Sequence, residues 1–477
     1  MGDSGRHGRN VGWLALADVF GKAISIFYFA YLSRKLSIVE NGWYGTFIVF
    51  VPILTGINAL GLQDIVTREV AQRRERVHHL MGMGTVAQLA AFVLIVPSAW
   101  LVTGLLNYAY GLRVIVLLAA VAALERTLIG MQTGILAAYE KFKYVSIITM
   151  AVRSAAVSGG ILLLFFGYGL MPLLALILVV YAAELLFSYA VARVQCARYR
   201  WRIDFGEGPM LLYQGSRMAV MRFLGTAYYH MDLPVMNAVA TPEMTGYYAI
   251  GTRFILVLWT LSNLVESVAY PVLSRKAIDT EEAQFFVMGR LIKLMAIISF
   301  PIAVGMTVLS ADIVVTLCGA KYAPGAIAVA ALTWILAFHM LMRPADLYLR
   351  AKALQNRVGW CYACAFAFKA GLSLYVIPRY GITGFIVLNL AATSVLFVAM
   401  NTVAMRVLPL LTWRHIAALL ARPFLAAAIM GLSVLFLRGQ TILLSVPVGV
   451  AAYGIAVLAL GVLDDVDKDL IWSAIRR

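Results

Sequence analysis

Long apolar runs recur along the whole chain, each separated from the next by a short polar segment. Because a helix crosses a bilayer with about 20 mostly apolar residues, the pattern predicts fourteen spans. They are expected near residues 11–33, 42–62, 82–106, 112–137, 145–167, 170–192, 210–236, 245–270, 287–310, 325–349, 358–378, 382–405, 416–437 and 441–463. The sequence therefore predicts an all-α polytopic membrane protein with about 14 transmembrane helices.

The composition agrees with a chain that lies mostly in lipid. Hydrophobic residues make up 62% of the 477 positions and charged residues 13%, whereas soluble domains are about half apolar and about a quarter charged. The basic excess, 39 Lys and Arg against 23 Asp and Glu, then indicates a cytoplasmic bias of the loops rather than binding of nucleic acid. The first apolar run lacks a following small-residue cleavage site, so we expect it to be retained as a span.

Residues that carry catalysis or bind metals form no recognisable motif in the chain. The four cysteines are too few for a disulfide framework. Cys361 and Cys364 have C-x-x-C spacing but lie in an apolar run, where they are expected to pack. There is no P-loop, no cluster of metal ligands and no nucleophile constellation in the sequence. We therefore expect no enzyme activity, no catalytic residue, no metal and no cofactor.

The distribution of Lys and Arg predicts the orientation of the spans. Twenty-four basic residues fall in alternate segments that include both termini, and six fall in the segments of the opposite face. Both termini are therefore expected in the cytoplasm, in a multi-pass protein of the cell (inner) membrane. Nine further basic residues lie inside predicted spans, where this bias does not explain them. These nine are Lys22, Arg126, Arg153, Arg217, Arg222, Arg253, Arg343, Lys369 and Arg422.

Two short sequence patterns recur at similar distances along the chain. GWYGTF at Gly42–Phe47 returns as GYYAIG at Gly246–Gly251, 204 residues later, and YGLMP at Tyr168–Pro172 returns as YGITG at Tyr380–Gly384, 212 residues later. Two parallel six-helix repeats are a transporter architecture. We predict six-helix lobes at residues 1–205 and 206–410, related by pseudo-symmetry. Residues 411–477 would add two transmembrane helices and a cytoplasmic tail.

Several motifs then point to a known family. They are the N-G-x-Y-G pattern at Asn41–Gly45, LGLQDIVTREVAQ at Leu60–Gln72, Asp232 followed by TGYYAIGTRF at Thr245–Phe254, and AYPVLSRKA at Ala269–Ala277. Over about residues 10–405 the chain resembles the polysaccharide transporters, the Wzx-type O-antigen and lipid-linked oligosaccharide flippases of the multidrug/oligosaccharidyl-lipid/polysaccharide (MOP) exporter superfamily.

The resemblance implies two six-helix bundles, alternating access, and outward flipping of a polyprenyl-diphosphate-linked oligosaccharide, a polysaccharide repeat unit. The chain departs from the family pattern at Ala249–Gly251, where the small residue is shifted, and in having fourteen predicted spans where many relatives have twelve. The extra helix pair also occurs in the similar lipid II flippases. A lipid II flippase, or another exporter of the superfamily, therefore stays an alternative.

The basic residues within spans outnumber the acids there, which suggests a cationic cavity. Charged residues in spans face a bundle interior or a watery cavity, and Arg pairs with phosphate oxygens in a bidentate way. The in-span acids are Asp18, Glu125, Glu184, Asp232, Glu266 and Asp346. The residues expected to bind the diphosphate are Arg217, Arg222, Arg253, Lys22, Arg343, Lys369 and Arg153. Snorkelling toward the cytoplasm is the alternative for at least one of Arg126 and Arg153, and is expected for Arg422.

Four residues are candidates for coupling flipping to ions or protons. Asp18 stands four residues from Lys22, on one helix face, where it either takes part in coupling or neutralises Lys22. His339 and Asp346 share a face with Arg343 beside Pro344, where they form either a titratable relay or a structural clip between helices. Asp232 either caps a helix end or protonates during transport.

Other observations bear on partners and rivals. The aromatic residues Trp43, Tyr44, Tyr228, Tyr229, Tyr247 and Tyr248 are interpreted as an ordinary interfacial belt rather than as sugar-stacking groups. A drug antiporter would need an acidic cavity, and a membrane-embedded glycan polymerase or ligase would need a large outer loop. We expect a lipid-linked oligosaccharide substrate and membrane lipids as partners, with a polysaccharide polymerase and other assembly proteins as further candidates.

Overall fold

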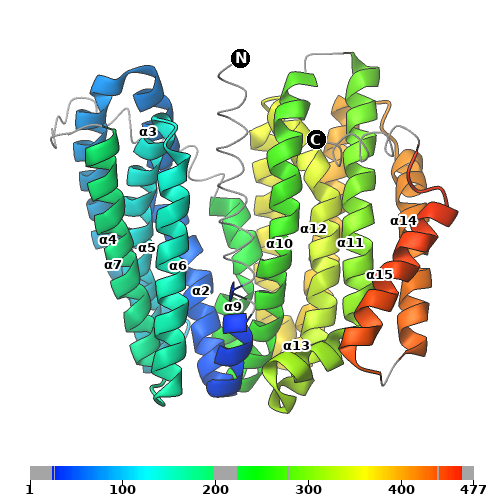
Figure 1. Cartoon of the computed structure of the whole chain (residues 1–477), viewed down its shortest axis with the longest axis horizontal. Coiled ribbons are helices and arrows are strands. Elements are labelled where there is room, and N and C mark those ends of the chain that lie inside the picture. Colours follow the sequence, from blue (N-terminus) through cyan, green and yellow to red (C-terminus); the bar gives the residue numbers. More distant parts are fainter. Residues whose placement is uncertain (1–23, 26, 197–222, 277–279, 438–439, 465–477) are drawn as a thin grey trace. The chain divides into compact units, whose positions relative to one another are not determined.

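A computed structural model of the chain describes residues 24–25, 27–196, 223–276, 280–437 and 440–464. Every regular element in these ranges is a helix (Figure 1). The contacts divide the chain into two compact units, Met1–Ala249 and Ile250–Arg477. The predicted lobe boundary at residue 205 falls outside the described ranges, so the three-part division of the sequence stays a prediction.

The first unit is built around one central helix. Its elements are α2 (Ile38–Asn58), α3 (Leu62–Gln72), the short η1 (Arg74–Arg76), α4 (Val77–Leu105), α5 (Tyr110–Ala138), α6 (Phe142–Phe165), α7 (Leu170–Gln195), α9 (Asp232–Val239) and the start of α10 (Pro242–Lys276). Helix α5 contacts α2, α3, α4, α6 and α7. Small and β-branched residues of α5, such as Ile115 and Ala119, allow this close packing against Phe47 of α2 and Leu173 of α7.

Helix α2 begins at a capping box. Ser37 and Glu40 form a capping box, in which the Glu40 N–H donates to Ser37 Oγ at 3.2 Å and the Ser37 N–H donates to Glu40 Oε2 at 2.9 Å. The box fixes the start of the helix at Ile38, four residues before the predicted span at residue 42.

The second unit contains α11 (Glu281–Cys318), the short η2 (Ala320–Gly325), α12 (Ala326–Ala351), α13 (Gln355–Val407), α14 (Trp413–Phe436) and α15 (Ile442–Ala459). Helix α11 contacts α12, α14 and α15, and α12 contacts α13. Helices α11 and α14 each start after a threonine, Thr280 and Thr412, whose hydroxyl accepts a hydrogen bond from a backbone N–H of the first turn.

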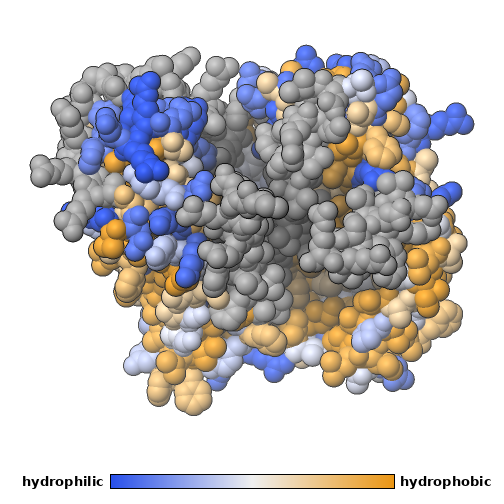
Figure 2. Space-filling view, turned by 45° about the horizontal axis from the view of Figure 1, so that its top comes forward, coloured by the Kyte–Doolittle hydropathy of each residue, from blue (hydrophilic) through white to orange (hydrophobic). Residues whose placement is uncertain are grey.

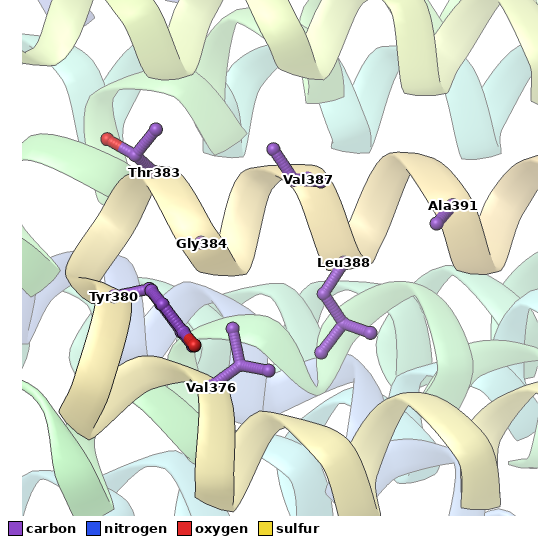
Figure 3. A pocket seen from close by; sticks show the side chains of 7 residues that line it. All are labelled: Val376, Tyr380, Thr383, Gly384, Val387, Leu388 and Ala391. Atoms are coloured by element: carbon purple, nitrogen blue, oxygen red, sulfur yellow. The ribbon is translucent and has the colours of Figure 1, made fainter.

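Helix α13 is two arms joined at Gly381, whose backbone (φ 60°, ψ −152°) is non-helical. Only glycine adopts this conformation readily. The arms match the predicted spans 358–378 and 382–405. Figure 3 shows Tyr380 and Val376 of one arm and Leu388 of the other bordering a pocket of about 550 Å³ at this bend. Its lining is Val376, Tyr380, Thr383, Gly384, Val387, Leu388 and Ala391, almost wholly apolar.

Helix α15 is bound to α11 by a hydrogen bond, and the segment after α15 is bound to α11 by an ion pair. Pro301 in α11 has no N–H to donate to the carbonyl of Ile297, four residues earlier. The Tyr453 hydroxyl of α15 donates to that carbonyl at 2.8 Å, so the bond missing from α11 is replaced from a neighbouring helix. Lys293 of α11 also pairs with Asp464, beyond the end of α15, at 2.8 Å.

Ten of the described helices are long and apolar enough to cross a membrane. Large apolar side chains such as Leu94, Phe165, Phe187 and Phe436 are exposed, and Figure 2 shows hydrophobic residues over much of the lower part of the visible face, with hydrophilic residues along its upper part. The chain is an all-α, multi-pass membrane protein. The count of fourteen spans stays a prediction, because the first and seventh predicted spans lie largely outside the described residues.

Candidate functional site

The segment Tyr228–Asn237 places a buried acid at the start of a short helix. Asp232 is the first residue of α9, and the hydroxyl of Tyr248 in α10 donates to Asp232 Oδ2 at 2.5 Å. Both side chains are buried. A hydrogen bond to the charged form stabilises it, so the phenol offsets part of the cost of burying this carboxylate. The two roles open for Asp232, helix end and proton acceptor, both remain predictions.

Helix α9 is held by two further hydrogen bonds. Asn237 Nδ2 donates to Thr46 Oγ1 of α2 at 2.8 Å, and the hydroxyl of Tyr108, in the loop between α4 and α5, donates to the carbonyl of Pro234. Burial raises the pKa of Tyr108, which keeps the phenol protonated and therefore a donor. Tyr228 and Tyr248 are completely buried, so the prediction that these two belong to an interfacial belt is wrong.

Residues related by the sequence repeat touch each other where α2 meets the first turns of α10. A side chain at Gly42 would press on Gly246, and one at Gly45 would press on Ala249. Each pair is separated by 204 residues, the offset of the repeat. Residues that contact their own repeat equivalents lie beside a local twofold axis, as isologous contacts do. A side chain at Gly246 would also collide with the carbonyl oxygen of Ile38, which is why this crossing needs glycine.

The first unit holds a charge cluster on α5, α6 and α7. Arg126 Nη1 lies 3.0 Å from Glu184 Oε2, and the Arg126 guanidinium lies 5.3 Å from the centre of the Tyr181 ring. The charges of Arg153 and Glu125 also act on Tyr181. Two bases therefore face two acids, and the cluster is balanced.

The second unit holds a cluster in which two arginines share one acid. Asp346 of α12 is completely buried and accepts hydrogen bonds from Arg343 Nη1 at 2.5 Å and from Arg350 Nε at 2.7 Å. The Arg343 side chain is 13% exposed and that of Arg350 42% exposed. Arg350 follows the predicted span 325–349 and was not among the residues expected to bind the diphosphate, although its spacing of four residues from Asp346 on a helix was a usable signal.

Three more of the predicted residues lie in the same unit. His339 of α12 is buried against Trp259 of α10, with ring centres 4.3 Å apart. Lys369 of α13 and Arg253 of α10 are buried as well. The structure therefore brings Arg343, Asp346 and Arg350 together, with His339 one turn before Arg343 on the same helix. Lys369 and Arg253 lie on α13 and α10.

Of the remaining predicted residues, two are described by the structure and four are not. Arg153 is half-buried in the cluster of the first unit. Arg422, expected to snorkel, is exposed and donates to the carbonyl of Gly461 at 3.2 Å, beyond the end of α15. Four predicted residues lie outside the described ranges: Asp18, Lys22, Arg217 and Arg222. Among the residues that are described, no group of three or more His, Cys, Asp and Glu side chains is placed to hold a metal.

Comparison with solved structures identifies the fold. The chain is similar to a structure described as lipid II flippase MurJ in an inward closed conformation, with a TM-score of 0.76, 14% identity, and coverage of 97% of this chain and 99% of that one. It is also similar to an inward-facing multidrug resistance MATE family transporter of the MOP superfamily, with a TM-score of 0.60, 12% identity, and coverage of 81% and 95%. A MOP superfamily transporter from Pyrococcus furiosus follows, with a TM-score of 0.57, 12% identity, and coverage of 83% and 95%.

These similar structures are transporters and flippases, not enzymes, and the fold is that of the MOP superfamily. No curated protein was found whose sequence matches the chain. A family model described as "Polysaccharide biosynthesis protein" matches residues 31–327, which is more than half of the chain. The protein belongs to this polysaccharide biosynthesis protein family.

Proposed function

We propose that this chain flips a polyprenyl-diphosphate-linked oligosaccharide from the cytoplasmic to the outer leaflet of the cell membrane, by alternating access of a cationic central cavity. Both termini would lie in the cytoplasm. A polysaccharide polymerase and other assembly proteins would act beside it. Membership of a polysaccharide biosynthesis family, on the fold of MOP transporters, supports this substrate class.

The observation that carries the proposal is the set of basic side chains on the helices of the second unit, two of them buried. Arg343 and Arg350 both donate to Asp346, and Lys369 and Arg253 are buried in other helices of the same unit. Burying a cationic side chain costs free energy, and an anionic ligand lowers that cost. A diphosphate offers oxygens that match the arginine fork.

The membrane potential favours the proposed direction. Moving one negative charge out of a cell that is inside-negative by 100 mV gains about 2.3 kcal/mol, and a doubly charged diphosphate gains about twice that. The protein then needs to lower the cost of bringing the diphosphate across the hydrocarbon core, which the cationic side chains would do.

The proposal is tested by flipping in proteoliposomes of a fluorescent polyprenyl-diphosphate sugar, with Arg343, Lys369 and Arg253 replaced singly by Ala. Loss of one charge-assisted hydrogen bond, about 1.5–3 kcal/mol, predicts rates lowered about tenfold or more. Arg422→Ala is the matched control and is expected to flip at the normal rate, since that arginine is exposed. Unchanged flipping in all three variants, with each variant folded by size-exclusion chromatography, contradicts the proposal.

A second candidate, flipping of lipid II, is favoured by one observation. The similarity to the lipid II flippase structure covers 97% of this chain, including the region of α14 and α15, whereas the multidrug transporter covers 81%. Competition of lipid II against the oligosaccharide carrier in the same liposomes separates the two, because the true substrate should suppress flipping of the probe at the lower concentration.

A further inference from the structure

Helices α2 and α3 form one discontinuous path through the first unit. Only Ala59, Leu60 and Gly61 separate them, and Leu60 and Gly61 adopt left-handed backbone conformations, with φ of 48° and 66°. Such a conformation is unusual for a leucine, and strained positions of this kind cluster at functional sites. Beyond the break α3 does not leave the bundle, since Gln63 packs against Gly130 of α5.

The break is buried inside the unit. Asn58, the last residue of α2, donates from Nδ2 to Thr127 Oγ1 of α5 at 2.9 Å, and the Thr127 hydroxyl donates to the carbonyl of Leu124 at 2.8 Å. Helix α2 is 21 residues long, or about 31 Å at 1.5 Å per residue. The break is therefore about one thickness of the hydrocarbon core from the start of α2 at Ile38.

Two buried amide groups meet at Thr127 and leave their oxygens unused. Gln88 Nε2 of α4 donates to the Thr127 carbonyl at 3.5 Å, opposite the bond from Asn58. Asn58 is 1% and Gln88 5% exposed, and the oxygens Asn58 Oδ1 and Gln88 Oε1 accept no hydrogen bond from the described residues. Buried acceptors rarely lack a hydrogen-bond partner, so a hydrogen-bond donor or a cation is expected beside these two oxygens.

The break in the backbone adds further acceptors. Leu62 N–H donates to the Ala59 carbonyl at 2.9 Å, and not to the carbonyl of Asn58 as it would in a continuous helix. Carbonyls at the C-terminal end of α2 therefore lack their helical partners and carry the negative end of the helix dipole. The positive end of the α3 dipole, at the N-terminus of that helix, is offset by Asp64 in its first turn.

We infer that this break forms a binding site for a monovalent alkali cation of the sodium class. Its ligands would be Asn58 Oδ1, Gln88 Oε1, the Thr127 hydroxyl oxygen and carbonyl oxygen from the end of α2. Hard cations prefer such oxygen ligands, and ends of broken helices coordinate sodium in other transporters. A ligand set made of neutral oxygens suits a single positive charge better than a divalent ion.

The base next to Thr127 along α5 does not repel a cation strongly. This residue, Arg126, is paired with Glu184, so its charge is offset. A bound cation would join α2, α4 and α5 at one point and so fix the angle between α2 and α3. This inference does not depend on the flipped substrate, because binding is measured without it.

The experiment uses the full-length protein in detergent, with the thermal unfolding midpoint followed as sodium chloride replaces choline chloride at constant ionic strength. Binding to the folded state raises the midpoint in a saturable way, and the wild-type protein is expected to show this with sodium. Gln88→Leu and Asn58→Leu should abolish the response. Gln132→Leu, which changes another buried glutamine of α5, should keep it.

Two carboxylate variants keep the test decisive even if the leucine variants fail to fold. Gln88→Glu and Asn58→Asp keep the shape and add a negative charge, so each should lower the half-saturating sodium concentration about tenfold, since ligand charge tunes affinity. Hydrogen exchange of residues 56–62 should slow in sodium. An equal midpoint in sodium and choline, or an unaltered sodium response in both carboxylate variants, overturns the inference and leaves a bridging water as the occupant.

Discussion

The charge clusters of the two units differ in balance and in access to water. In the first unit Glu184 is buried, but the side chain of its partner Arg126 is 40% exposed. In the second unit Asp346 is 0% exposed and accepts hydrogen bonds from two arginines. The sequence repeat therefore relates the glycine contact of α2 and α10 but not the two described charge clusters. Among the described residues, a buried acid of the first unit is paired with one arginine, and a buried acid of the second unit is paired with two.

Replacing Asp346 by Asn is expected to have the largest effect. It leaves two guanidinium groups without their buried carboxylate, and breaking a buried ion pair costs about 3–5 kcal/mol. The free energy of unfolding in mixed detergent micelles measures this loss. Asp312→Asn, which changes an exposed acid of α11, is the control and should leave stability unchanged. A loss below that of the Glu184 variant described next would contradict the difference between the clusters.

Replacing Glu184 by Gln should cost less, about 1–2 kcal/mol, because the amide still accepts a hydrogen bond and the exposed Arg126 can turn to water. The same unfolding measurement applies, with exposed Glu140→Gln as its control. Flipping should persist in Glu184→Gln, since Arg126 is not among the residues proposed to bind the diphosphate. A complete loss of flipping in a folded variant would show that the first cluster takes part in transport.

The smallest effect is expected where α3 and η1 meet in the first unit. Arg76 Nη1 lies 2.6 Å from Glu69 Oε2, with the side chains 31% and 20% exposed. Pairs this accessible contribute about 0–1 kcal/mol, and salt screens them. Glu69→Gln should therefore change stability slightly at low salt and not at all in about 1 M salt, where the Debye length is about 3 Å. If the loss of stability persists at high salt, the pair is shielded from ions as a buried pair is, and the prediction is contradicted.

The positions of most helices could be predicted from the sequence, because the apolar runs are long and a bilayer imposes one length on each. The bend of α13 was predicted as two spans, with Gly381 between them. The span predicted at residues 42–62 ends where α2 breaks, but the left-handed backbone of Leu60 and Gly61 was not predicted. Hydropathy records only that a run is apolar, and it carries no information on the backbone conformation of single residues at its end.

The candidate site was less predictable than the fold. Arg343 and Asp346 were placed on one helix face, and the structure brings them together. Arg350 was missed because the predicted span ended one residue before it, whereas α12 extends through it. The burial of Tyr248 was missed because an aromatic residue near a helix end looks the same in sequence whether it faces lipid or a carboxylate. Arg217 and Arg222 lie outside the described residues and stay predictions.

The hydroxyl of Tyr453, bound to the carbonyl that Pro301 leaves without a donor, has a consequence for shortened forms of the chain. A protein ending before α15 would present that carbonyl to hydrocarbon, where no water can solvate it. The C-terminal hairpin thus supplies a hydrogen bond that α11 cannot make within itself. A chain shortened before α14 should be removed by the cell's quality-control proteases, unless Pro301 is replaced by a residue with its own amide hydrogen.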